Sequence, residues 1–97
     1  MYILSAKLTF DIPAAASLKD KRQVRRSLVE KTRGRFNVSV SEVGAQDVHK
    51  TLVIGIAVVS GDMSHAQNSM DEIIRFMENN PNAELTSVEK YDTGSTV

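Results

Sequence analysis

The chain of 97 residues contains no cysteine and no tryptophan. Without cysteine it can form no disulfide framework, thiolate zinc site or cysteine nucleophile, and a reducing compartment suits it. Its longest apolar run, residues 52–59, is far shorter than the ~20 residues of a membrane-spanning helix. The apolar N-terminal stretch lacks a basic leader region and is interrupted by Lys7 and Asp11, so we expect no signal peptide. These absences predict a cytoplasmic protein that does not contact membranes.

The chain also lacks net charge, since 12 Lys and Arg residues balance 12 Asp and Glu residues. The charges are nevertheless segregated. Residues 17–35 hold eight of the basic residues and two of the acidic ones, which gives this segment +6 and the remaining 78 residues −6. A neutral total weakens any argument for tight, nonspecific nucleic-acid binding steered by the whole protein. A local basic surface remains the best functional clue.

Hydrophobic periodicity predicts six elements. Strands are expected where apolar residues alternate or run continuously, and helices where they recur every three or four residues. In chain order we expect a strand at 1–10, a helix at 17–35, strands at 36–43 and 51–59, a helix from Asp62 or Ser64 to a stop at 79–82, and a strand at 83–92.

The order strand, helix, strand, strand, helix, strand is that of the split βαβ, ferredoxin-like pattern. We therefore predict an α+β two-layer sandwich with a four-stranded antiparallel sheet and two helices on one face. Right-handed crossovers place the first and third strands side by side at the centre, where we expect them to run parallel. Residues 1–92 are expected to form this single domain, followed by a flexible tail at 93–97.

Both helices carry end signals. Ser17 is the expected N-cap of the first helix, with Asp20 completing a capping-box-like pair, and Gly34 is the expected left-handed C-cap. The second helix has a regular apolar stripe. Its members are Ala66, Met70, Ile73, Ile74 and Met77.

The first helix is the candidate binding element. At 100° per residue, four of its cations fall within about 60° of one another along roughly 20 Å, opposite Val24 and Leu28. These four are Lys19, Arg22, Arg26 and Arg33. The whole predicted set of nucleic-acid-binding residues is Lys19, Lys21, Arg22, Arg25, Arg26, Arg33 and Arg35. The plainer interpretation is a solvated helix face whose basic residues suit the helix dipole.

Few aromatic residues are available for base stacking. An RNA-recognition motif exposes aromatic side chains on its first and third strands, but the third predicted strand has none. On the first strand, Tyr2 and Phe10 share the phase of Leu4 and Leu8, which places them toward the core. Any RNA contact is therefore expected through phosphates and shape.

No catalytic pattern is present. The loop at residues 11–16 contains no glycine and begins with an acid, so it does not match the phosphate cradle of acylphosphatase-type enzymes. His49 and His65 have no ligand spacing with each other, and Asp71 and Glu72 are adjacent on a helix and do not face each other. We expect a non-enzymatic protein with no catalytic residues, no metal site and no cofactor.

The uncovered face of the sheet is a second candidate surface. Asn37, Ser39 and Ser41 are its predicted interface residues, beside a low patch around Gly55 and Ala57. The strand at 36–43 would be an edge open to strand addition. The polar connection at 44–50 carries a lone Val48, a weaker candidate. These features favour, as the alternative function, a protein–protein interaction or homo-oligomeric assembly module.

Three blocks of the sequence together resemble one known family: SLKDKRQVRRSL, RFNVSVSEV and TLVIGIAVVSGD. The chain resembles the YlxP-like family of small bacterial proteins, a domain of unknown function (503), over about residues 1–92. The matching residues are Ser17, Leu18, Lys19, Lys21, Arg22, Arg35, Phe36, Asn37, Val38 and Ser39. The chain departs from the family in its TGSTV tail and at Arg25, where an apolar residue would be common.

The resemblance implies a ferredoxin-like fold and transfers no catalytic residue. Members are often encoded beside translation and ribosome-maturation factors, which implies by association a role near the ribosome or RNA. Our leading hypothesis is a non-enzymatic protein that binds an anionic partner, such as ribosomal or other structured RNA, through the first helix. We also expect that the protein can form a homodimer.

Overall fold

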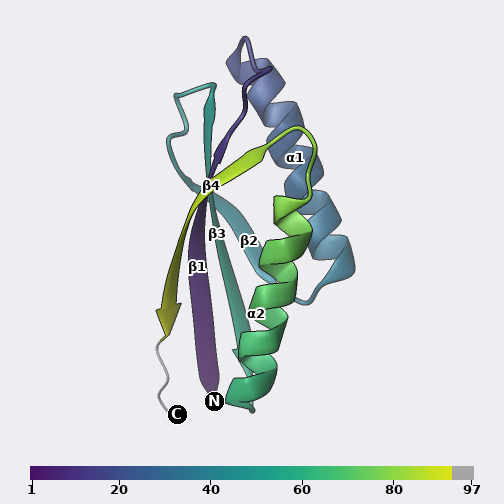
Figure 1. Cartoon of the computed structure of the whole chain (residues 1–97), viewed down its shortest axis with the longest axis vertical. Coiled ribbons are helices and arrows are strands. Elements are labelled where there is room, and N and C mark those ends of the chain that lie inside the picture. Colours follow the sequence, from purple (N-terminus) through teal and green to yellow (C-terminus); the bar gives the residue numbers. More distant parts are fainter. Residues whose placement is uncertain (93–97) are drawn as a thin grey trace.

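Six elements follow one another in the predicted order βαββαβ (Figure 1). The computed structural model of the chain describes residues 1–92, so the predicted tail at 93–97 lies outside the described residues. The elements are β1 (Tyr2–Asp11), α1 (Leu18–Arg35), β2 (Ser39–Gly44), β3 (Thr51–Ser60), α2 (Met63–Glu78) and β4 (Glu84–Asp92).

The four strands form one sheet in the order β2-β3-β1-β4. Every neighbouring pair is antiparallel. The first and third strands lie side by side at the centre as predicted, but the expectation that they run parallel is wrong. The connection through α1 makes β1 and β2 parallel, with one strand position between them. The hairpin that follows β2 places β3 in that position, where it runs in the opposite direction.

The core lies between the sheet and the two helices, which cover the same face (Figure 1). Alternate residues of β1 and β3 point into it because side chains on a strand alternate between its faces. α2 packs against β1 and β3, whereas α1 packs against β2 and α2. The predicted stripe of α2 is confirmed: Ala66, Met70, Ile73 and Met77 are buried, and Ile74 is partly buried against the core.

Side chains cap the N-termini of both helices. The Ser17 hydroxyl accepts a hydrogen bond from the Asp20 amide at 3.2 Å, while Asp20 Oδ2 accepts from the Ala16 amide at 2.9 Å. This reciprocal arrangement confirms the predicted cap of α1. At α2, Asp62 Oδ2 accepts from the His65 amide at 3.0 Å. Asp62, rather than Ser64, is therefore the N-cap.

The end of α1 differs from the prediction. The helix continues through Gly34 to Arg35, and Phe36 is its C-cap in an extended conformation, so the predicted left-handed cap at Gly34 is wrong. The strand starts at Ser39 instead of residue 36. The Phe36 ring makes an edge contact with Phe76 of α2, with centroids 5.5 Å apart. The alternation at 36–38 therefore reflects packing against α2 and the core, which a single-sequence pattern cannot distinguish from strand pairing.

No helix within residues 1–92 is long and apolar enough to cross a membrane.

The cap of α2 provides a direct test of the local structure. We expect Asp62→Ala to lower the free energy of unfolding by about 1 kcal/mol, because an N-terminal amide loses its acceptor. Ser64→Ala, the matched control in the first turn of the same helix, should change it by less than about 0.5 kcal/mol. Urea unfolding followed by circular dichroism measures both. Equal losses in the two variants would contradict the assignment of the cap.

Candidate functional site

The outer side of α1 carries the predicted row of cations. Lys19, Arg22, Arg26 and Arg33 are all exposed, whereas Leu28 is buried and Val24 is partly buried. Spacings of three, four and seven residues keep these four side chains on one side of a helix. We call these four residues the α1 ridge. Within residues 1–92, the side chains of Lys19, Arg22 and Arg26 form no hydrogen bond or ion pair. The carboxylate of Glu30 is not within ion-pair distance of Arg26.

Lys21 lies inside the protein, with 2% of its surface exposed. Its ammonium group donates to the Ala45 carbonyl at 2.5 Å and the Val48 carbonyl at 2.8 Å, and lies 3.1 Å from Glu42 Oε2. Lysine has three donor protons, and three oxygens surround this one. The expectation that Lys21 contacts a nucleic acid therefore needs correction, because the side chain does not reach the surface.

Glu42, on β2, links two predicted binding residues. Its Oε1 accepts a hydrogen bond from Arg25 Nη1 at 3.0 Å, while Oε2 faces Lys21. Oε2 is buried and, among the described residues, makes no hydrogen bond beyond this ion-pair contact. The carboxylate is thus held by one hydrogen bond and two positive charges. The same contact accounts for Arg25 at a position where the family resemblance leads us to expect an apolar residue.

The last two predicted cations are also engaged within the chain. Arg33 Nη2 donates to the Val40 carbonyl of β2 at 2.9 Å, although the side chain stays exposed. The Arg35 guanidinium lies over the rings of Phe36 and Phe76, 5.7 and 5.3 Å from their centroids, in cation–π contact. Four of the seven predicted contacts therefore have partners in the fold.

A groove of about 330 Å³ between α1 and β2 brings some of the predicted residues together. Arg25, Arg26 and Arg33 line its helical side, and Ser41 and Glu42 line its strand side. The groove continues the ridge toward the edge of the sheet. Glu42 already neutralises Arg25, and the exposed acid Glu30 lines the groove together with Arg26 and Arg33.

A lysine also ties the loop between β1 and α1 to the loop between β2 and β3. Lys50 Nζ donates to the carbonyls of Pro13 and Ala15 at 3.0 and 3.1 Å, and the Lys50 carbonyl accepts from the Ile12 amide at 2.9 Å. The carbonyls of this loop thus face a cation. Ala45, in the other loop, has φ of 52°, a left-handed conformation that costs a non-glycine residue about 1–2 kcal/mol. The Lys21 hydrogen bond to its carbonyl helps to hold it.

The sequence analysis missed the role of Lys21, although a signal exists. Lys21, Leu28 and Thr32 are the buried residues of α1, and their spacing of seven and four places them in one direction on the helix. A lysine in phase with a core leucine indicates a buried or paired ammonium. A net-charge count does not distinguish this buried lysine from the surface cations.

The face of the sheet away from the helices is uncovered, and we call it the open face. Seventeen residues of the four strands lie on it, as their pairing positions show. They are Ile3, Ser5, Lys7, Thr9, Asp11, Ser39, Ser41, Val43, Thr51, Val53, Gly55, Ala57, Val59, Glu84, Ser87, Glu89 and Tyr91. Ser39 and Ser41 are exposed on it as expected, whereas Asn37 is exposed but precedes β2.

The patch predicted to be low around Gly55 is filled. Val43 is an extra residue of β2, opposite a register shift between Glu42 and Gly44, and such a bulge bends the strand and redirects its side chains. A Cβ atom on Gly55 would lie 2.8 Å from Val43 Cγ1. Gly55 is therefore needed for the close approach of this valine, which covers it.

Lys7, Glu89 and Tyr91 form a polar cluster on the open face. Glu89 Oε2 accepts from the Tyr91 hydroxyl at 2.6 Å and lies 3.4 Å from Lys7 Nζ. The Tyr91 hydrogen bond, followed by the hydrogen bond and charge of Lys7, lowers the pKa of Glu89 below its ordinary value of 4.5. The same hydrogen bond raises the pKa of Tyr91 above 10.0, because it favours the protonated phenol.

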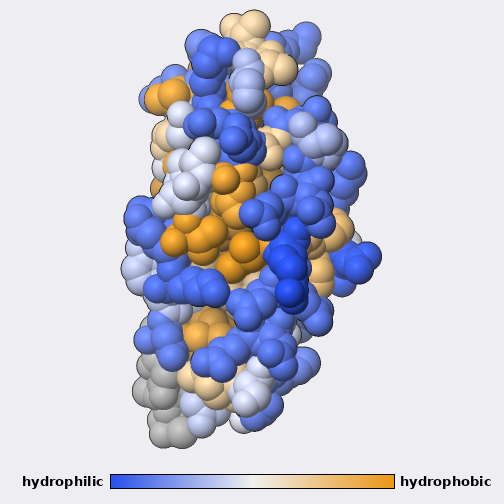
Figure 2. All heavy atoms as spheres, in the orientation of Figure 1, coloured by the Kyte–Doolittle hydropathy of each residue, from blue (hydrophilic) through white to orange (hydrophobic). Residues whose placement is uncertain are grey.

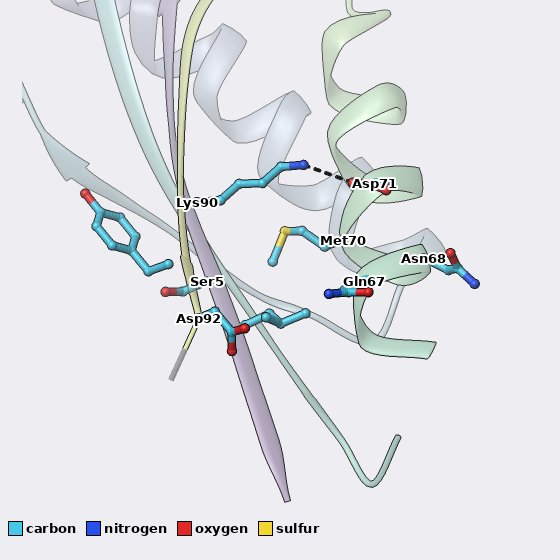
Figure 3. A pocket seen from close by; sticks show the side chains of 9 residues that line it. Ser5, Gln67, Asn68, Met70, Asp71, Lys90 and Asp92 are labelled. Carbon is cyan, nitrogen blue, oxygen red and sulfur yellow. Dashed lines mark hydrogen bonds and ion pairs between the residues drawn. The ribbon is translucent and has the colours of Figure 1, made fainter. Parts of the chain in front are cut away.

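A cleft of about 340 Å³ lies between α2 and β4 (Figure 3). Lys90 reaches across it from β4 to Asp71 on α2, with 3.1 Å between Nζ and Oδ1. Figure 2 shows an apolar area between these two elements, bordered by hydrophilic side chains. None of the predicted nucleic-acid-binding or interface residues lines the cleft. Its charged residues are Asp92 and the ion pair of Asp71 and Lys90.

The two histidines lie apart, with His49 partly buried in the loop after β2 and His65 exposed in the first turn of α2. Among residues 1–92, no group of three or more His, Cys, Asp or Glu residues could hold a metal ion.

A family model described as a protein of unknown function (DUF503) matches residues 3–90. The chain belongs to the DUF503 family. It is 35% identical over 72 residues to the uncharacterised protein YlxP of Bacillus subtilis (strain 168), covering 74% of this chain and 78% of that protein. Both findings confirm the resemblance drawn from the three sequence blocks.

Two designed proteins with solved structures resemble this DUF503 chain. The de novo designed protein Foldit4 gives a TM-score of 0.54 at 13% identity, covering 99% of this chain and 100% of that one. A de novo designed protein with a ferredoxin fold, solved by NMR, gives 0.55 at 12% identity, covering 100% and 89%. At these identities the likeness concerns the fold alone, and it confirms the ferredoxin-like class. The function must be argued from the residues of the chain.

The buried lysine of this DUF503 chain can be tested by substitution. We expect Lys21→Met to lower the free energy of unfolding by about 3–5 kcal/mol, because it leaves the buried Glu42 Oε2 without its cation and the Ala45 and Val48 carbonyls without their donor. Lys19→Met, two residues away on the exposed side, should change it by less than about 0.5 kcal/mol. Adding Glu42→Gln to Lys21→Met should recover part of the loss. A cost below about 1 kcal/mol for Lys21→Met would contradict the structural role.

The interactions of Glu89 in the polar cluster of the open face can be tested by measuring its pKa. Because the folded-state pKa of Glu89 is lowered, its interactions stabilise the protein above the ordinary pKa of the carboxyl and are lost as pH falls through the lowered value. NMR titration of the Glu89 side-chain carboxyl should give a pKa below 4.5. In Tyr91→Phe the value should rise toward the ordinary one, since the largest cause is removed. An unchanged pKa in that variant would show that the hydrogen bond does not form in solution.

Proposed function

We propose that this protein binds structured RNA through the phosphate backbone, using the α1 ridge. One observation supports the proposal most directly. The side chains of Lys19, Arg22 and Arg26 are exposed on one side of α1 and have no hydrogen-bond or ion-pair partner within residues 1–92. Arg33 continues the row and keeps an exposed side chain.

The dimensions of the ridge suit a nucleic-acid backbone. From Lys19 to Arg33 the helix rises about 21 Å, at 1.5 Å per residue. A rigid helix holds the four cations in one line, so several phosphates of one strand can be contacted together. The groove beside Arg26 and Arg33, which Glu30 and Glu42 also line, continues this surface toward β2.

Backbone contact, rather than base readout, fits the composition of this surface. Cations that contact phosphates fix the position of a protein on RNA but do not read the sequence. Stacking in the manner of an RNA-recognition motif would need exposed aromatic residues on β1 and β3. On the open face the aromatic residue is Tyr91 of β4, and its hydroxyl is bonded to Glu89. We therefore expect recognition of RNA shape with little sequence preference.

The neutral net charge of the chain limits the expected affinity for RNA. Long-range attraction between the whole protein and RNA is absent, so affinity depends on the few contacts of the ridge. Nonspecific complexes of this kind have dissociation constants of about 10⁻⁴–10⁻⁶ M at physiological salt. Ribosomal RNA is the first RNA to test, because the family resemblance implies a role near the ribosome.

Fluorescence anisotropy with a labelled, folded fragment of ribosomal RNA tests the proposal. For the wild type we expect log K to fall against log salt with a slope of about −3, as four phosphate contacts predict. Lys19→Glu, Arg22→Glu and Arg26→Glu combined should weaken binding at least about 30-fold and reduce the slope to about −1.

A control with the same change in charge separates ridge contacts from a general charge effect. Lys31→Glu, Arg75→Glu and Lys90→Glu combined remove three exposed cations that lie outside the ridge. This control should keep most of the affinity. Absence of binding by the wild type, or equal losses in both triple variants, would refute the proposal.

A further inference from the structure

We propose that the open face binds a second copy of this chain and forms a twofold-symmetric dimer. The proposal does not rest on RNA binding, because the α1 ridge lies in the helical layer on the other side of the sheet (Figure 1). Three properties of the open face support it: its charge, its exposed apolar side chains and its size.

The middle of the open face is almost free of charge. A quarter of the chain is Asp, Glu, Lys or Arg, yet the charged residues in the middle of this face are Lys7 and Glu89, which lie 3.4 Å apart as an ion pair. Its other two charged residues, Asp11 and Glu84, are strand partners at one end of the sheet. Away from that end the face has no net charge that would attract a charged partner or repel an identical copy of itself.

Exposed valines cluster on the half of the face formed by β2 and β3. Val59 is 66% exposed and Val43 is 52% exposed. Ala57 lies between them on β3 and Val53 lies beyond Val43, and both are partly buried. Grouped exposed apolar side chains mark interaction surfaces, whereas single ones are normal. Covering this group removes apolar area from water, which is the main driving force of association.

The other half of the face, formed by β1 and β4, carries the longer side chains Lys7 and Tyr91. Row by row, Tyr91 lies beside Ser5, Ala57 and Ser39, and Lys7 lies beside Gly55. A twofold axis along the strand direction places the β1–β4 half of each copy on the β2–β3 half of the other. The Tyr91 ring then lies over Ser39 and Ala57 of the partner, and the aliphatic part of Lys7 lies over its Gly55 and the Val43 that covers it.

The size of the face suits a stable interface. Strands about 4.8 Å apart and up to ten residues long give a projected area of roughly 600 Å², about a tenth of the 5771 Å² surface of the chain. Standard interfaces bury about 800 Å² per partner, and the relief of the side chains adds to the projected area. Two twisted sheets pack face to face about 10 Å apart.

The edge of β2 is a poorer interface for a second copy. Arg33 already donates to the outward carbonyl of Val40, and the bulge at Val43 interrupts the regular edge near its end. Both features oppose strand addition. The structure thus favours the open face over the β2 edge as the dimer interface.

Sedimentation equilibrium from micromolar to millimolar protein is the first test. The wild type should pass from a monomer of 10.7 kDa to a dimer of twice that mass. Val43→Lys with Val59→Lys should raise the dimer dissociation constant at least about 30-fold, because each substitution places a charge in the interface twice, once from each copy. Val48→Lys is the matched control, since Val48 is 49% exposed but lies in the loop after β2. It should leave the constant unchanged.

An isotope-filtered NOE experiment on mixed labelled and unlabelled wild-type protein needs no variant. It should give intermolecular contacts from the methyl groups of Val43, Val53 and Val59. A wild type that stays monomeric, a dimer that survives the double substitution, or intermolecular contacts from α1 or the β2 edge would each overturn the proposal.

Discussion

The position of α1 on β2 and of the loop after β2 depends on a single buried ammonium group. Lys21 brings a positive charge into the protein interior, where an unpaired charge would cost several kcal/mol. The charge is tolerated because Glu42 and two backbone carbonyls surround it. These acceptors come from β2 and from the following loop. The lysine can therefore be buried only when helix, edge strand and loop have their native arrangement, so these contacts help to specify the packing of α1 on β2.

This arrangement divides the cations of α1 into two groups. On the inner side, Lys21 and Arg25 are paired with Glu42, and their charge stabilises the fold. On the outer side, the α1 ridge faces solvent. The net charge of +6 for residues 17–35 thus overstates the positive charge that a partner could contact. The side of α1 on which a cation lies shows whether it is available to a partner.

Much of the fold could be predicted because local signals agree with it. The alternation in β1, the apolar stripe of α2 and the caps at Ser17 and Asp62 each depend on neighbours within a few residues. The errors concern long-range contacts. Phe36 alternates like a strand residue but packs on Phe76, and the left-over space at Gly55 is filled by Val43 from the neighbouring strand. Lys21 is the same kind of error, because its acceptors lie more than twenty residues further along the chain.

The acidic residues of β4 lie far from the ridge, whereas Glu30 lines the groove beside Arg26 and Arg33 and offsets part of their charge. β4, which carries Glu84, Glu89 and Asp92, is at the opposite edge of the sheet from β2 and α1. Three strand spacings separate the two edges by about 14 Å. At physiological ionic strength, interactions between exposed charges are largely screened beyond about 8 Å. A partner in contact with the ridge therefore experiences mainly the cations of α1, and the zero net charge of the chain limits the rate of encounter more than the strength of a contact once it has formed.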